Sequence, residues 1–137
     1  MTGLPVFSSP RFPGAERARL RAALISEEAA EFAEAASAGD LVGMVDALAD
    51  LLYVTYGAAL ELGVDVDAAF REVHRSNMTK LWTEEEARAA VSDPDHPAVR
   101  MERMLDAERG WVVFRADGKV LKGPGFSEPD LARFAHP

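Results

Sequence analysis

The sequence predicts an all-α fold: an antiparallel helical bundle completed by oligomerisation, with a short hairpin-like extension at the C-terminus. Two segments carry most of this prediction. Residues 14–37 are mostly Ala, Arg, Leu and Glu, which are good helix formers. Residues 41–62 are apolar on nearly every side of a helical wheel, which is typical of a buried helix. A third helix over residues 68–81 follows a short connection, so we expect three antiparallel neighbours.

The first helix is expected to begin near Gly14, after an arm that contains three prolines. Ala38-Gly39 is its expected stop, because glycine commonly ends a helix. Four side chains are expected on its buried side: Leu20, Leu24, Phe32 and Ala35.

Three glutamates lie on the side of this helix that should be apolar. At about 100° per residue, Glu27, Glu28 and Glu31 fall within the same arc as the apolar side chains. An amphipathic helix normally keeps glutamate away from its apolar stripe. A glutamate-rich helix is most often just a solvated face, but this placement favours a functional site.

The central helix carries two aspartates and no basic residue to pair with them. Asp40 is its expected N-cap and Gly63 its expected end. Asp46 and Asp50 lie one turn apart, and residues 41–62 contain no Lys or Arg. Because an ionised carboxylate on a buried helix costs several kcal/mol unless it is paired, a partner must come from elsewhere. A divalent cation is the simplest candidate.

The third helix is expected to be capped by Asp65 or Asp67. Its expected core contacts are Phe70, Val73 and Met78. With its neighbours it would complete a helical core over residues 14–82. We treat residues 1–137 as one domain, in which 83–110 are an insertion and 111–137 a C-terminal extension.

The insertion and the extension are expected to contain short elements. Thr83 and Glu86 have the spacing of a capping box that opens a helix over residues 84–91. Another helix is expected over residues 98–109, and a hairpin over residues 111–123. The expected turns and the last helical turn are marked by Asp117-Gly118, by Pro124-Gly125, and by Ser127 as the cap of a turn with Leu131 and Phe134.

The composition narrows the function classes. The net charge of −8 argues against nucleic-acid binding, which needs a basic face. With no cysteine there is neither a disulfide nor a thiolate metal site. The N-terminus does not have the pattern of a signal peptide, and two aspartates would be costly in a membrane-spanning helix. We expect a cytoplasmic protein with neither a membrane nor a nucleic acid as partner.

The first two helices, placed side by side, bring five carboxylates together: Glu27, Glu28, Glu31, Asp46 and Asp50. Mg²⁺ prefers such oxygen ligands and often shares phosphate oxygens with a substrate, and Mn²⁺ could substitute for it. The cluster contains no histidine, which disfavours zinc and a histidine-containing di-iron centre. Basic residues for a triphosphate could come from Arg75, Lys80, Lys119 and Lys122.

These motifs resemble a known superfamily. E-E-A-A-E at 27–31, followed by D-A-L-A-D-L-L-Y at 46–53, is similar to the all-α nucleoside triphosphate pyrophosphohydrolases. That superfamily includes MazG-like proteins, dimeric dUTPases and phosphoribosyl-ATP pyrophosphohydrolase, and the best match is the MazG-like branch with a dUTPase-like activity. The resemblance implies Mg²⁺-dependent cleavage of a nucleoside triphosphate, with dUTP as one candidate, into monophosphate and pyrophosphate.

The resemblance also implies roles for single residues. Glu28, Glu31 and Asp50 match metal ligands, and Glu27 matches the acid that binds a further metal or orients the attacking water. Asn77 and Lys80 match the segment in which the superfamily contacts the nucleotide. One departure concerns the central helix, where Ala47 stands in place of a glutamate and Asp46 is the candidate replacement.

Two other functions remain open. Ala47 would also fit a helical dimerisation or regulatory module that kept the fold and lost the chemistry, and a metal-binding protein without turnover is a third possibility. In every case the central helix is apolar on too many sides for one chain of this length to cover. We therefore expect a homo-oligomer, either a dimer or a tetramer.

Overall fold

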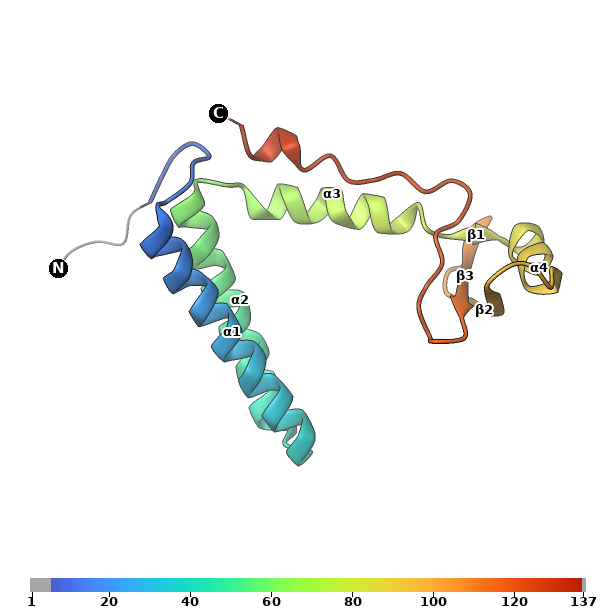
Figure 1. Ribbon diagram of the computed structural model, residues 1–137, viewed down its shortest axis with the longest axis horizontal. Helices are drawn as coiled ribbons and strands as arrows, with labels where there is room; N and C mark the ends of the chain where they lie inside the picture. The colour runs from blue at the N-terminus through green and yellow to red at the C-terminus, as the bar shows by residue number, and fades with distance from the viewer. Residues whose placement is uncertain (1–5, 137) are drawn as a thin grey trace. The chain divides into compact units, whose positions relative to one another are not determined.

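The computed structural model describes residues 6–136, which form two compact units (Figure 1). The first unit comprises the chain up to Asp67 together with the residues from Leu131 onward, and the second comprises Ala68–Asp130. Most of the expected third helix belongs to the second unit, so the expected packing of three neighbouring helices is not confirmed.

Two long helices form the first unit. The helices α1 (Ala15–Ala38) and α2 (Leu41–Leu62) pack against each other as an antiparallel hairpin (Figure 1). Gly39 ends α1 with a φ of 69°, and the side chain of Asp40 accepts a hydrogen bond of 3.0 Å from the Gly43 amide at the start of α2. Both predicted helices and the predicted cap are confirmed.

The segment before α1 runs along the C-terminal end of α2. The Phe7 amide donates to the Leu60 carbonyl at 3.1 Å, and the Arg11 amide donates to the Leu62 carbonyl at 2.9 Å. Gly63 ends α2 in the left-handed region with a φ of 65°, as the sequence predicts. The carbonyls at this helix end, which have no partner within the helix, are therefore bound by the preceding chain.

A buried carboxylate joins α1 to the same end of α2. The Glu61 side chain is 1 % exposed and accepts hydrogen bonds from Arg17 and, at 2.6 Å, from Arg21. The hydrogen bonds from these two arginines, that of Arg21 first, lower the pKa of Glu61 from 4.5 to about 2. The pairing fixes the register of the two helices and allows a charged group to be buried.

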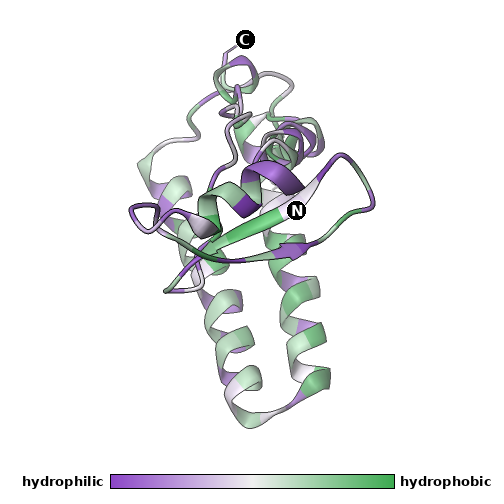
Figure 2. Cartoon of the chain, turned by 90° about the vertical axis from the view of Figure 1, so that its right-hand side faces the viewer, coloured by the Kyte–Doolittle hydropathy of each residue, from purple (hydrophilic) through white to green (hydrophobic). Residues whose placement is uncertain are grey.

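The expectation that α2 is buried is wrong for the single chain. Its buried residues are Ala47, Ala59 and Glu61, whereas Val42 and Tyr53 are each 80 % exposed and Leu52 is 61 % exposed. Figure 2 shows the apolar residues that run along the helices of this pair. Leu20 of α1, also expected to be buried, is exposed, because one pair of helices covers only the faces that meet. By length and composition alone α2 could cross a membrane, a criterion that the mostly buried core helices of soluble proteins also meet.

Helix α3 (Val66–Met78) buries polar rather than apolar side chains. The expected core residues Phe70 and Met78 are exposed, while Glu72 and Ser76 are buried. The reason is that the chain after Phe126 lies on this side of the helix. The Ser76 hydroxyl donates to the Ser127 carbonyl at 2.8 Å, and the Asp130 amide donates to Glu72 at 2.9 Å.

The structure decides between the alternatives for one predicted cap and differs from another. Helix α3 begins at Val66, so Asp65 directly precedes it, whereas Asp67 lies in its first turn, where it accepts a hydrogen bond of 2.8 Å from the Tyr56 hydroxyl. Ser127 caps no helix: its amide donates to the Thr79 hydroxyl at 2.9 Å. The last helical turn is a 3₁₀ turn, η1 (Ala132–Phe134), which follows Leu131.

A three-stranded antiparallel sheet in the second unit corrects the all-α prediction. The strands β1 (Trp82–Thr83), β2 (Ala98–Arg103) and β3 (Arg109–Arg115) are ordered β1-β3-β2. The expected helix over residues 98–109 is wrong, because β2 pairs with β3 through these residues. The protein is thus mainly helical with a small sheet.

Helix α4 (Glu84–Ser92) and the predicted turns are confirmed. The Thr83 and Glu86 side chains form the capping box at its start. At Gly118, with a φ of 81°, the chain turns back, but the second arm of the expected hairpin makes one bridge, between Phe114 and Val120. Pro124-Gly125 lies in a turn. The core of this unit consists of Trp82, Ala87, Ala90, Ala98 and Val113.

Candidate metal and nucleotide site

The five predicted acids lie on the hairpin of α1 and α2. Glu28 is half-buried, and the other four are exposed. The pKa of the Glu28 carboxyl is raised, first by burial and then by the charges of Glu31, Asp50, Glu27 and Asp46, in that order. The structure therefore brings the glutamates of α1 and the aspartates of α2 close enough for mutual repulsion.

An acidic hollow of about 450 Å³ opens at the turn between these helices. Glu31 and Asp46 line it, and so do Glu34 and Asp40, which the sequence did not single out as site residues. The spacing of Glu34, three residues after Glu31, could have indicated its place on the same helix face. Asp40 was assigned only as a helix cap.

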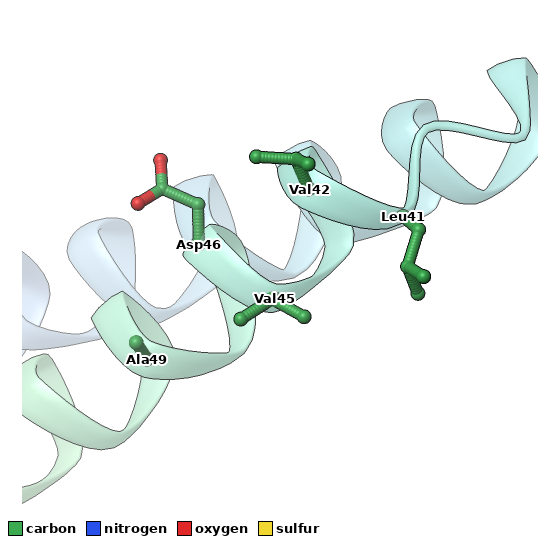
Figure 3. A pocket seen from close by; sticks show the side chains of 5 residues that line it. All are labelled: Leu41, Val42, Val45, Asp46 and Ala49. Atoms are coloured by element: carbon green, nitrogen blue, oxygen red, sulfur yellow. The ribbon is translucent and has the colours of Figure 1, made fainter.

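Ala47 and Asp46 differ in their surroundings. Ala47, where the resemblance would place a glutamate, is 2 % exposed. Asp46 is exposed and lines both the acidic hollow and an apolar pocket formed with Leu41, Val42, Val45 and Ala49 (Figure 3). The carboxylate that is accessible in this turn of α2 is therefore that of Asp46.

The candidate donors are carboxylates, the ligands that a hard divalent cation prefers. Among residues 6–136, no group of three or more Asp, Glu, His or Cys side chains is placed so that it could hold a metal ion. Mg²⁺ does not require three protein ligands, since it is usually held by one or two carboxylates together with substrate phosphates and water. The five carboxylates form an open group and repel one another. A group of this kind suits a cation that is also bound by a phosphate.

The predicted basic residues all belong to the second unit, and two of them contact carboxylates. Arg75 donates to Glu72 at 3.0 and 2.8 Å and to the Glu128 carbonyl at 3.0 Å. The hydrogen bond to Glu72 raises the pKa of Arg75. Lys122 donates to the Glu128 carboxylate at 2.9 Å. Arg75 is thus held in place by its own neighbours.

The remaining candidates are Asn77, Lys80 and Lys119. The Lys80 ammonium donates to the Asn77 side-chain oxygen at 2.7 Å. Both residues line an apolar pocket against the sheet. Lys119 is exposed in the turn that follows Gly118.

One comparison with known proteins finds a family for this chain. The family model for phosphoribosyl-ATP pyrophosphohydrolase matches residues 3–77, which include α1 and α2 with all five acids. A search of curated proteins finds no match. The family supports an activity of the nucleotide pyrophosphohydrolase type, that is, hydrolysis of a phosphoric anhydride. Since the match spans more than half of the chain, the protein belongs to the phosphoribosyl-ATP pyrophosphohydrolase family.

Proposed function

We propose that the chain is a Mg²⁺-dependent pyrophosphohydrolase that cleaves a nucleoside triphosphate, with dUTP as one candidate, into monophosphate and pyrophosphate. Mn²⁺ could replace Mg²⁺. One observation carries the proposal: five carboxylates gather on one helical pair, where burial, followed by the charges of the other four, raises the pKa of Glu28. Such a cluster is unfavourable without a cation, and a cation shared with phosphates would relieve its repulsion. We further propose a cytoplasmic house-cleaning role without nucleic-acid or membrane partners.

In this proposal the acids have separate roles. Glu28, Glu31 and Asp50 would hold the cation, with Asp46 in place of the glutamate that is missing at Ala47. A bound Mg²⁺ supplies neutralisation of phosphate charge and lowers the pKa of the attacking water. Glu27 would orient that water and accept its proton. As the new bond to phosphorus forms, the anhydride bond breaks and the electron pair leaves with pyrophosphate.

The basic residues would stabilise the charge of the triphosphate. Lys80, Lys119 and Lys122 are flexible cations of the kind that bind phosphate oxygens. The guanidinium of Arg75 is held by Glu72 and the Glu128 carbonyl. Arg75 would therefore keep the chain after Phe126 in place against α3. It could also bind phosphate through its remaining donors. Asn77 would contact the nucleotide.

We propose that the enzyme is a homodimer or homotetramer. The proposed oligomer rests on the exposed apolar side chains of α2. Five of them are at least 60 % exposed: Leu41, Val42, Val45, Leu52 and Tyr53. Contiguous exposed apolar surface of this kind on a soluble protein usually marks an interface. Two copies of α2 would cover each other as an isologous pair.

The test is pyrophosphate release from a panel of canonical and modified nucleoside triphosphates, with Mg²⁺, Mn²⁺ or a chelator. We expect metal-dependent release of equal amounts of monophosphate and pyrophosphate from at least one substrate, and no release with the chelator. Orthophosphate as the first product would contradict the proposal. No turnover of any substrate by a folded, metal-binding protein would favour the degenerate module, with Ala47 as its cause.

A further inference from the structure

We propose that the apolar pocket beside Asn77 and Lys80 binds the base of the nucleotide, an inference that rests on the proposed function. The pocket has a volume of about 340 Å³ and lies within the second unit. Val112, Phe114 and Val120 of the sheet region form its walls, and Leu81 and Met104 complete them. None of these five residues lies within the segment that matches the family.

The size and lining of the pocket fit a base better than a whole nucleotide. Ligand pockets for drug-sized molecules run from about 300 to 1,000 Å³, so this one lies near the lower limit. Its walls are aliphatic or aromatic, and Val112 is 9 % exposed. A triphosphate would lose hydration there without gaining partners. The flat, weakly polar ring of a base could pack against these side chains.

The polar rim of the pocket offers a hydrogen-bond donor to a base. Lysine can only donate, so the 2.7 Å contact with Lys80 assigns the acceptor oxygen of Asn77 to this pair. The Asn77 amide nitrogen is thereby left as a donor, and no hydrogen bond from it is found among residues 6–136. It could donate to a carbonyl or ring nitrogen of the base.

One cation lies at the pocket itself. Lys80 lines the pocket, and its ammonium group lies 6.0 Å from the centre of the Phe126 ring. The Lys122 ammonium lies 4.0 Å from the same ring, but it pairs with the Glu128 carboxylate at 2.9 Å. A pocket for an apolar ring next to the Lys80 ammonium matches the two halves of a nucleotide. A purely apolar ligand, such as a leucine side chain of a protein partner, would make no use of Lys80.

The experiment separates the base from the sugar phosphate. Binding of deoxynucleoside monophosphates and of 2-deoxyribose 5-phosphate is measured by calorimetry with a chelator present, so that neither metal nor turnover is required. We expect at least one monophosphate to bind at least about tenfold more tightly than the sugar phosphate. Packing of the base against the pocket contributes enough binding free energy for this difference. Val120→Trp and Met104→Trp should each fill the pocket and remove this difference.

Val99→Trp is the matched control, because Val99 is a half-exposed valine of the same sheet that does not line the pocket. This variant should keep the difference between monophosphate and sugar phosphate. Equal binding of both ligands by the unchanged protein would overturn the inference, and so would an unaltered difference in folded Val120→Trp and Met104→Trp. Both of these results could occur in a protein that releases pyrophosphate, so they would overturn the base pocket without affecting the proposed function. If a monophosphate binds more tightly than the sugar phosphate but no substrate is turned over, only the proposed function is contradicted.

Discussion

Glu61 shows how a single charged residue can hold two helices together. It lies on a helix whose apolar composition suggests a continuous hydrophobic contact, yet it is the most deeply buried charged side chain among the described residues. Arg17 and Arg21 compensate its charge from α1. The nearer of these partners in sequence is forty residues away, so no local pattern could predict the pairing.

Replacing Glu61 should destabilise the protein in a pH-dependent way. The folded-state pKa of about 2 lies below the ordinary 4.5, so the stabilisation is present above pH 4.5 and is lost as the pH falls towards 2. A shift of this size corresponds to about 3 kcal/mol. Glu61→Gln should therefore lower the free energy of unfolding at pH 7 by about 3 kcal/mol and flatten its pH dependence between 4.5 and 2.

Urea denaturation at several pH values measures this effect. Glu16→Gln is the control: Glu16 lies in the first turn of α1, the helix that carries Arg17 and Arg21, and is exposed, so its replacement should cost less than about 1 kcal/mol. An equal loss in the two variants would mean that burial of the Glu61 charge contributes nothing specific.

The acidic cluster, in contrast, was largely predictable. The placement of Glu28 and Glu31 on one helix face, and of Asp50 on the next helix, follows from helical periodicity alone. Helical spacing could also have placed Glu34 beside Glu31, but Asp40 could not be predicted as a neighbour of Glu31, because the path of the turn between the helices is set by the tertiary contact. The exposure of Asp46 and the burial of Ala47 likewise depend on how α1 and α2 pack.

At the scale of elements, local signals were sufficient where they were strong. The helices α1 and α2 end at a glycine, and α2 and α4 begin at a side-chain cap, and these signals need only a few neighbouring residues. Strand β2 has no such signal: Ala98–Arg103 contains helix-forming residues, and its pairing with β3 decided the outcome. Strand preference depends on partners and burial more than on intrinsic propensity.

Gly63 is expected to be the least replaceable glycine of the helical hairpin. Its φ of 65° disfavours any side chain, and an added Cβ would lie 2.2 Å from the Ser9 carbonyl oxygen. Gly39 has a similar φ of 69°, but a Cβ there meets nothing within 4 Å. Gly39→Ala should therefore cost about 1 kcal/mol, and Gly63→Ala clearly more, because the preceding chain must move.

Thermal unfolding of the two glycine variants provides the comparison. A lower midpoint for Gly63→Ala than for Gly39→Ala is expected. Identical midpoints would show that the segment around Ser9 is not held against the end of α2.

At the scale of the whole molecule, the exposed apolar surface of α2 requires a partner copy in our account. Leu52→Arg would place a charge at the centre of this surface, where an interface would have to bury it without a partner. We expect this variant to have a lower oligomeric mass by analytical ultracentrifugation. Val99→Arg, a change at an exposed apolar residue of β2, should leave the mass unaltered. A monomeric unchanged protein would contradict the proposed oligomer.

The most direct test of the central claim is a comparison of Glu28→Gln with Glu16→Gln in two assays, Mn²⁺ binding by electron paramagnetic resonance and pyrophosphate release. Both variants remove one carboxylate from α1, but only Glu28 lies among the five acids. Glu28→Gln should weaken Mn²⁺ binding about tenfold or more and abolish turnover, while Glu16→Gln keeps both. Full turnover and full Mn²⁺ affinity in Glu28→Gln would contradict the assignment of this cluster as the metal site.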